Sequence, residues 1–435
     1  MTSVLSADWV LPVEGAPIRD GAVALREGRI EAVGTSADLG AGQHYEGAAI
    51  VPGFVNAHAH LEYAVYAGFG DGLPFAPWIA LHVERKRRLE RADMEAIARL
   101  GAAECLRSGI TTVGDLAYSG ASAHACAELG LRAIVYLEVF GRDPGETMEQ
   151  FHEKREYVAP AVSERVAVGV SPHAPYTCST EVYAACSALG LPLATHLNES
   201  QHELDWLVRG EGPWQPLSEL LMTPDGRSGI VRLADAGLLD ERVVAAHCVK
   251  VDAKEIALLA RHDVAVVHCP RSNALLGCGI APLAALRSAG LRIGIGTDGI
   301  SSVPSHDYFE ELRTTISMAR ARDEEAGALS AAEALELATL GGARALGLEH
   351  EIGSLVPGNR ADLTVVSLAG SPYVPWEDPA AAVVYGGGPE RITATLVDGE
   401  VRYERGGFGW HELIDAASRA RSLLLQQDPA PARGT

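Results

Sequence analysis

The chain has 435 residues, 47% of them hydrophobic, which suffices to bury one large core or a large and a small one. Its formal net charge of −21 argues against general binding to nucleic acid, because phosphate binding depends on clustered lysines and arginines. No apolar stretch approaches the roughly 20 residues that cross a bilayer, and the N-terminus lacks the basic start and apolar run of a signal peptide. We therefore expect a cytoplasmic protein with no membrane or nucleic-acid partner.

The two ends of the chain share a pattern of short strands and tight turns. Residues 21–34 alternate apolar and polar side chains around a turn, which is typical of a β-hairpin. A similar pattern returns over residues 352–405, with Asp398 and Gly399 as a turn pair. We therefore predict one small β-sandwich domain, assembled from residues 1–50 and 352–410.

The middle of the chain, residues 51–351, alternates apolar strands with amphipathic helical segments. Near-continuous apolar strands are typical of a parallel sheet that is covered on both faces. Eight strands with intervening helices over about 300 residues match the length of a (β/α)8 barrel of the TIM type. The predicted strands are 50–56, 110–115, 133–139, 166–171, 192–197, 243–248, 264–268 and 292–297. Predicted helices include 92–109, 252–263 and 330–347, and residues 411–435 are expected to form a last helix and a disordered tail over 428–435.

Four side chains with metal-binding chemistry stand at the ends of these strands. His58 and His60 are two residues apart, so both point to one face of a strand. His196 ends the fifth predicted strand and Asp298 closes the eighth. A single barrel histidine is commonly a hydrogen-bonded core residue, but this pair together with further strand-end histidines indicates a metal site. Three neutral imidazoles and a carboxylate suit one zinc or ferrous ion, with room for a water.

Two further side chains with catalytic chemistry stand at a strand end or just beyond one. Glu199 follows His196 by three residues, where a carboxyl group could reach over the metal and carry protons. His247 ends the sixth predicted strand, where it could hydrogen-bond the attacking water or a developing alkoxide. Two other interpretations stay open: Glu199 could cap the following helix, and His247 could be a fourth nitrogen ligand.

These motifs resemble those of the amidohydrolase superfamily, in the branch that contains cytosine, guanine and thioadenosine deaminases and the triazine chlorohydrolases. The resemblance covers almost the whole chain. It implies that one divalent metal, zinc in preference to iron, is held by His58, His60, His196 and Asp298. The fourth strand ends without a lysine that could be carboxylated, which favours one metal over a bridged pair. Dimers are common among the relatives, so a homodimer stays open.

The same resemblance implies hydrolytic deamination of a heteroaromatic ring. In that reaction Asp298 takes a proton as water attacks a ring carbon, and Glu199 protonates the adjacent ring nitrogen. His247 stabilises the developing oxyanion, and ammonia leaves. The expected catalytic residues are therefore Glu199, His247 and Asp298.

The residues that bind the substrate are harder to assign. His173, after the fourth strand, falls where thioadenosine deaminases have a substrate-contacting histidine, and Trp78 and Glu84 fall where those relatives hold the nucleoside. The charged run at 84–91 is otherwise interpreted as a solvated helix face.

Residues 268–279 resemble the corresponding segment of aminofutalosine deaminases of the menaquinone pathway, whose adenine nucleoside carries a carboxyphenyl ketone. A guanidinium would bind that carboxylate in a bidentate pair, and Arg142 and Arg271 are the candidates. Either arginine could equally form a surface ion pair. The leading hypothesis is deamination of 6-aminodeoxyfutalosine, and the alternatives are a methylthioadenosine, adenosylhomocysteine, adenosine or guanine deaminase and a triazine chlorohydrolase.

Overall fold

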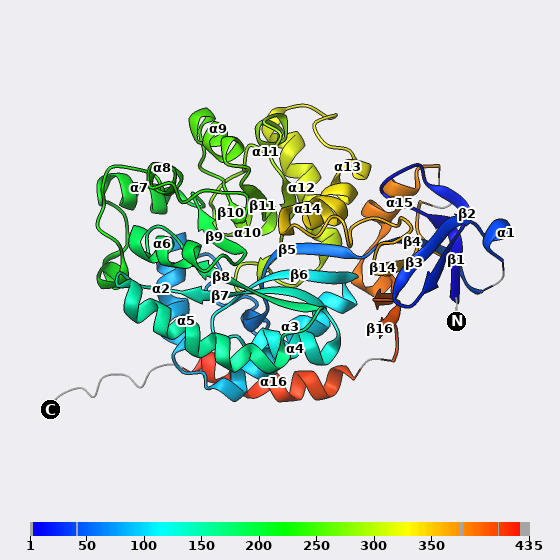
Figure 1. The fold of residues 1–435 in the computed structure, drawn as a ribbon, viewed down its shortest axis with the longest axis horizontal. Helices are drawn as coiled ribbons and strands as arrows, with labels where there is room; N and C mark the ends of the chain where they lie inside the picture. Colours follow the sequence, from blue (N-terminus) through cyan, green and yellow to red (C-terminus); the bar gives the residue numbers. More distant parts are fainter. Residues whose placement is uncertain (1–2, 41, 374–376, 408, 427–435) are drawn as a thin grey trace.

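The computed structural model describes residues 3–40, 42–373, 377–407 and 409–426. Its larger part is a parallel barrel in which strands that follow one another in the chain lie side by side (Figure 1). The eighth strand is interrupted: its first half, β12, pairs with β11, and its second half, β13, pairs with β5. The sheet therefore closes on itself, which confirms the (β/α)8 prediction. The barrel strands are β5 (Phe54–His60), β6 (Ile110–Ala117), β7 (Arg132–Val139), β8 (Val166–Pro172), β9 (Leu193–Leu197), β10 (Val243–His247), β11 (Ala265–His268), β12 (Ile293–Ile295) and β13 (Asp298–Gly299).

Helices surround this barrel (Figure 1). The predicted helix over 330–347 is divided by a wider π-type turn at Leu337–Gly341. Gly342 lets this segment approach β5, because a Cβ there would lie only 2.7 Å from the carbonyl oxygen of Val55. The helices are α2 (Phe75–Lys86), α3 (Arg91–Arg107), α4 (Ala121–Leu129), α5 (Pro144–Val158), α6 (Thr180–Ala188), α7 (Gln201–Arg209), α8 (Gly229–Asp235), α9 (Ala253–Arg261), α10 (Pro270–Leu275), α11 (Leu283–Ser288), α12 (Tyr308–Asp323), α13 (Ala331–Glu336) and α14 (Gly342–Leu346).

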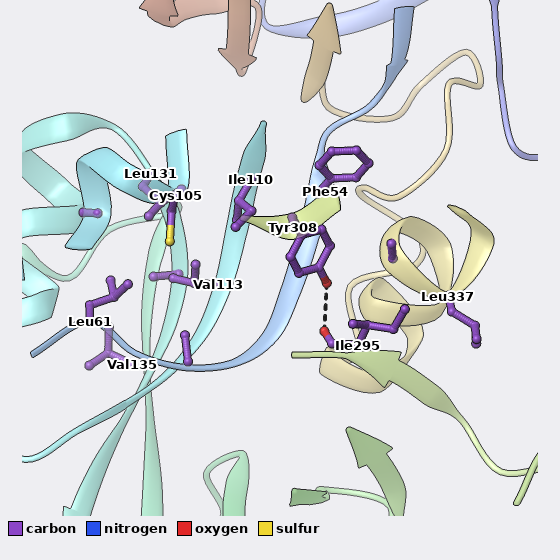
Figure 2. Packing of buried hydrophobic residues seen from close by; sticks show 14 of the residues in the cluster. Phe54, Leu61, Cys105, Ile110, Val113, Leu131, Val135, Ile295, Tyr308 and Leu337 are labelled. Atoms are coloured by element: carbon purple, nitrogen blue, oxygen red, sulfur yellow. Dashed lines mark hydrogen bonds between the residues drawn. The ribbon is translucent and has the colours of Figure 1, made fainter. Parts of the chain in front are cut away.

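A packed seam joins the first and last strands of the barrel (Figure 2). The ring centroid of Phe54 lies 5.3 Å from that of Tyr308 and 5.2 Å from that of Phe309. The Tyr308 hydroxyl lies 2.6 Å from the carbonyl oxygen of Val55 on β5 and 2.8 Å from that of Ile295 on β12. Burial of each ring contributes about 1.5–3 kcal/mol. This seam holds together the two strands whose ends carry His58, His60 and Asp298.

The two chain ends combine into one seven-stranded sheet outside the barrel (Figure 1). Strands β1 and β4 are parallel, and the other neighbouring pairs are antiparallel. The sheet has its own apolar core, which includes Leu5, Val23, Ile50 and Val365. In order across the sheet the strands are β16 (Glu400–Glu404), β15 (Ile392–Val397), β14 (Leu363–Ser367), β4 (Gln43–Pro52), β1 (Ser3–Val10), β2 (Ile18–Arg26) and β3 (Arg29–Thr35). Two short helices accompany it, α1 (Ser36–Leu39) and α15 (Pro379–Gly386).

The strand predicted over 50–56 is wrong, because the apolar run there is shared by two sheets. Residues up to Pro52 belong to β4 of the small sheet, and β5 of the barrel begins at Phe54. The chain crosses between the sheets at Gly53, where a Cβ would collide with the side chain of Thr111 at 2.1 Å. His60 is therefore the last residue of β5 and His58 lies two residues before it, so both belong to the strand rather than to the loop after it.

An ion-pair cluster joins the small sheet to the amino end of the barrel. Arg132, the first residue of β7, donates to Asp362 at 2.9 and 3.2 Å and to Asp398 at 2.6 Å. Arg165 donates to the second oxygen of Asp398 at 2.9 Å. Because Arg132 and Asp362 are buried, this cluster lies inside the joint. The opposite end of the barrel, where the strands end, stays free for a site.

The last helix, α16 (Trp410–Leu425), lies along α3 (Figure 1). Its Arg421 donates to the carbonyl oxygen of Val65 at 2.6 Å, which ties it to the loop after β5. The tail predicted to be disordered, 428–435, lies outside the described residues. Among the helices of the described chain, none has the length and apolar character to cross a membrane.

Candidate active site

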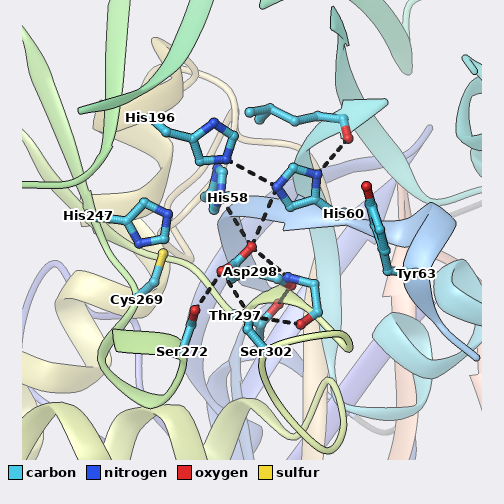
Figure 3. A network of polar contacts seen from close by, with 12 residues as sticks. His58, His60, Tyr63, His196, His247, Cys269, Ser272, Thr297, Asp298 and Ser302 are labelled. Carbon is cyan, nitrogen blue, oxygen red and sulfur yellow. Dashed lines mark hydrogen bonds and ion pairs between the residues drawn. The ribbon is translucent and has the colours of Figure 1, made fainter. Parts of the chain in front are cut away.

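The four predicted metal-binding side chains meet at the carboxyl end of the barrel (Figure 3). The Nε2 atoms of His58 and His60 lie 3.6 and 3.5 Å from Oδ1 of Asp298. The Nε2 atom of His196 lies 3.3 Å from that of His60. Three strands that are far apart in the sequence, β5, β9 and β13, therefore direct their ligand atoms to one point.

The hydrogen bonds of the histidines leave their Nε2 atoms available. Nδ1 of His60 donates to the carbonyl oxygen of Leu116 at 3.0 Å, and Nδ1 of His196 donates to that of His173 at 2.8 Å. The buried Nε2 of His58 has no hydrogen-bond partner among the described residues. A backbone acceptor on one ring nitrogen orients the lone pair of the other toward a metal. The arrangement fits a metal ion that would lie between these atoms.

Burial sets the protonation of this donor set. It lowers the pKa of His60 to about 3 and that of His196 well below its ordinary value, so both rings are neutral at physiological pH. Burial alone would raise the pKa of Asp298, but the surrounding histidines hold it well below its ordinary value. Neutral imidazoles with an ionised carboxylate are the ligands that zinc prefers.

The second oxygen of Asp298 is held by its neighbours (Figure 3). The hydroxyls of Ser272 and Ser302 donate to Oδ2 at 2.6 and 2.9 Å. Asp298 and His247 both have positive φ, 62° and 73°, which is strained for residues with a Cβ. Such strain persists only where the surroundings determine the conformation, as they do at functional sites.

Glu199 and His247 face each other across the same space, with 3.7 Å between Oε2 and Nε2. Burial raises the pKa of Glu199 well above its ordinary value, which favours the protonated acid. Nδ1 of His247 donates to Oδ1 of Asn273 at 3.0 Å, which leaves Nε2 directed at the cavity. Glu203 accepts the backbone N–H groups of Asn198 and Glu199 at 3.0 and 2.7 Å and so fixes the loop after β9.

A cavity of about 860 Å³ opens above these residues, large enough for a nucleoside. Among the predicted substrate-binding residues, Trp78, Arg142 and His173 line it. The indole of Trp78 donates to the carbonyl oxygen of Ser301 at 3.3 Å, and His173 lies 4.8 Å from the ring of His196.

Glu84 does not reach this cavity. The face of α2 that lines it carries Phe75, Trp78, Ile79, His82, Val83 and Lys86. Glu84 lies outside this stripe, with half of its side chain exposed, and pairs with Arg85 and Arg88 at 3.4 and 3.3 Å. The assignment of Glu84 to substrate binding is therefore wrong, because the register of the helix directs its side chain to solvent.

Arg271 is also misassigned. Its side chain is only 4% exposed and does not line the cavity. The guanidinium pairs with Glu310 at 2.9 Å and Glu311 at 3.4 Å, and it donates to the carbonyl oxygens of Ser305 and Asp307 at 3.1 and 3.0 Å. With these partners Arg271 holds the loop after β13 and has no free face for a substrate.

Charged residues that were not selected from the sequence also line the cavity, among them Lys86, Glu138 and Lys154. Interpreting 84–91 as a solvated helix face is therefore wrong at Lys86. Burial lowers the pKa of Lys86 to about 8 and raises that of Glu138 to about 7. Glu138 stands near the end of β7, and a polar residue near a strand end was the signal that could have identified it.

The Amidohydrolase family matches residues 49–402 of the chain. The chain is 33% identical to 5-methylthioadenosine/S-adenosylhomocysteine deaminase of Moorella thermoacetica, over 91% of this chain and 93% of the relative. It is 32% identical to 5′-deoxyadenosine deaminase of Methanothermobacter thermautotrophicus, with 89% and 90% covered. A zinc-bound adenosine deaminase from Xanthomonas campestris matches the fold with a TM-score of 0.87 and 29% identity, over 97% of this chain and 98% of that one. The chain therefore belongs to the amidohydrolase family and is a hydrolase that acts on carbon–nitrogen bonds.

Proposed function

We propose that the protein is a metal-dependent deaminase of adenine nucleosides. The observation that carries this proposal is a buried carboxyl group, Glu199, whose Oε2 lies 3.7 Å from Nε2 of His247 beside the histidine–aspartate cluster. An acid in this position can protonate a ring nitrogen, which amide hydrolysis does not require. The relatives named as deaminases of thioadenosine and deoxyadenosine compounds support the same choice of base.

We propose that His58, His60, His196 and Asp298 hold one divalent ion, and zinc is our choice because the donor set is three imidazoles and one carboxylate. When bound, such an ion acidifies water and makes hydroxide available near neutral pH. Two further groups also have ligand atoms within 4.8 Å of one another: His58 with His247 and Asp298, and Glu138 with His173 and His196. Because each of them shares at least one residue with the set of four, we propose one ion.

The side chains of this chain would then move the protons. Asp298 accepts one proton of the attacking water as its oxygen bonds to C6 of adenine, and Glu199 gives its proton to N1. His247, whose Nδ1 donates to Asn273, presents the lone pair of Nε2 to the attacking water and accepts a hydrogen bond from its second O–H while the C6–O bond forms. Asp298 passes its proton to the amine, ammonia leaves as the C6–N bond breaks, and the remaining hydroxyl proton returns to Glu199 as the C6 carbonyl forms.

The preferred substrate that we propose is 6-aminodeoxyfutalosine, whose tail carries a carboxylate. With Arg271 excluded, Arg142 is the residue we assign to that carboxylate, because it lines the cavity, although its Nη2 also donates to the carbonyl oxygen of Leu221. Arg87 and Arg91 line the same cavity and add positive charge. A guanidinium matches a carboxylate in a bidentate pair.

Ammonia release from a substrate panel tests the proposal. Purified, zinc-loaded protein is assayed with 6-aminodeoxyfutalosine, adenosine, 5′-methylthioadenosine, S-adenosylhomocysteine and guanine, and Glu199→Gln is the matched variant. We expect ammonia from adenine nucleosides and none from guanine, with turnover lost in Glu199→Gln while its zinc content stays that of the wild type. Ammonia release by Glu199→Gln at the wild-type rate would contradict the assigned acid.

A further inference from the structure

A second polar cluster lines the cavity beside the metal donor set, and the proposed reaction does not use it. Glu138 on β7 is only 2% exposed, and one carboxylate oxygen lies within 4.8 Å of ring nitrogens of His173 and His196. Lys86 from α2 and Lys154 from α5 line the same cavity. One buried and two half-buried charged groups next to the proposed reaction centre need partners, because unpaired charge away from water is costly.

The partners of the two lysines are clear. Lys86 donates to the hydroxyl of Tyr63 at 2.7 Å and its ammonium lies 3.6 Å from the ring centroid of Tyr118. Lys154 donates to the backbone carbonyl of Glu138 at 2.8 Å. An ammonium has three N–H donors, so Lys86 keeps donor capacity beyond the Tyr63 bond.

The carboxylate of Glu138 has no comparable partner. Among the described residues, its oxygens accept no hydrogen bond and form no ion pair within 4.0 Å, and Lys86 and Lys154 attract the carboxylate only from a longer distance. A buried acceptor that opens to a cavity is satisfied by a donor inside that cavity. Glu138 is thus free to accept hydrogen bonds from a bound molecule.

The signs of the charges limit what that molecule presents here. Glu138 disfavours an anion, and Lys86 and Lys154 disfavour a cation. A hydroxyl group is neutral and both donates and accepts, so it can serve a carboxylate and an ammonium at once. We propose that Glu138 and Lys86 bind the sugar hydroxyls of the nucleoside, Glu138 accepting the O–H and Lys86 donating to a hydroxyl oxygen. This inference rests on the proposed nucleoside deaminase function.

The test compares substrates that differ only in those hydroxyls. The value of kcat/KM is measured for adenosine and for 2′,3′-dideoxyadenosine with the wild type, Glu138→Gln and Glu156→Gln, an exposed carboxylate on the same helix that holds Lys154. We expect the wild type to favour adenosine at least tenfold, and Glu138→Gln to lose about tenfold to a hundredfold on adenosine but little on the dideoxy compound, as for hydrogen bonds to a charged group. Glu156→Gln should match the wild type on both substrates.

The outcomes separate this inference from the function on which it rests. If the wild type releases no ammonia from any adenine nucleoside, the deaminase proposal fails and the hydroxyl site fails with it. If ammonia is released but the wild type treats the two substrates alike, the hydroxyl site alone is overturned, and this result needs no variant to fold. An equal loss on both substrates in a folded Glu138→Gln would also overturn it. Inosine binding by calorimetry, stronger than 2′,3′-dideoxyinosine binding, should report the same preference without turnover.

Discussion

Replacing Arg271 separates a structural arginine from a substrate-binding one. The side chain is buried and holds Glu310, Glu311 and the backbone of the loop after Asp298. Removing one partner of a buried ion pair costs about 3–5 kcal/mol. Burial raises the pKa of Glu311 to about 8, so this carboxyl can stay protonated when its partner is lost. We therefore expect Arg271→Met to lower the free energy of unfolding by the lower end of that range, about 3 kcal/mol.

The effect on substrates should be uniform. Arg271→Met loosens the segment that follows Asp298, so kcat/KM should fall by a similar factor for adenosine and for 6-aminodeoxyfutalosine. Arg142→Met is the matched variant: it should keep the unfolding free energy within about 1 kcal/mol, as surface changes do, and lose selectively on the carboxylated substrate. Urea unfolding and steady-state kinetics measure both quantities. A selective loss in Arg271→Met without a loss of stability would refute the structural role.

Three further results are expected. Asn273→Leu leaves the buried Nδ1–H of His247 without an acceptor, which costs about 1–3 kcal/mol. The value of kcat should therefore fall about tenfold to a hundredfold, with the zinc content unchanged. An unaltered kcat would show that the hydrogen bond from His247 to Asn273 does not contribute to turnover. Asp298→Ala should hold less than one zinc per chain by elemental analysis and lose turnover, whereas a full complement of zinc would remove Asp298 from the ligand set. Burial alone would raise the pKa of Asp398, but Arg132 and Arg165 outweigh burial and hold that pKa below its ordinary value. The stability that Asp398 contributes is therefore present above about pH 4 and is lost as the pH falls through the folded pKa. Urea unfolding from pH 6 to 3 should show this decline, and Arg132→Met should flatten it.

The fold and the meeting of four polar side chains at the barrel rim were predictable because both follow from the geometry of parallel strands. Each barrel strand ends on the same rim, so polar residues that close apolar runs must meet there. His58, His60, His196 and Asp298 satisfy this rule, and they meet at the rim. The same rule applied to β7 would have selected Glu138, which stands one residue before the last residue of that strand.

The residues that line the cavity were less predictable, because their positions depend on the register of helix α2 and on partners that are distant in the sequence. Within 75–86, the cavity-lining residues recur at helical spacing, and that stripe passes through Lys86 and misses Glu84. Lys86 and Glu84 are both charged, so residue type could not distinguish them, but their positions in the helical repeat could. Arg271 was misassigned because its acidic partners, Glu310 and Glu311, lie about 40 positions later and nothing near it in sequence indicates them.

A zinc titration tests whether one ion in the histidine–aspartate cluster supports deamination. Protein freed of metal by a chelator is given increasing zinc, and ammonia release from adenosine is measured at each ratio. We expect negligible release without metal and a linear rise that ends at one zinc per chain. Full activity in the metal-free protein, or a rise that continues to two zinc ions per chain, would contradict it.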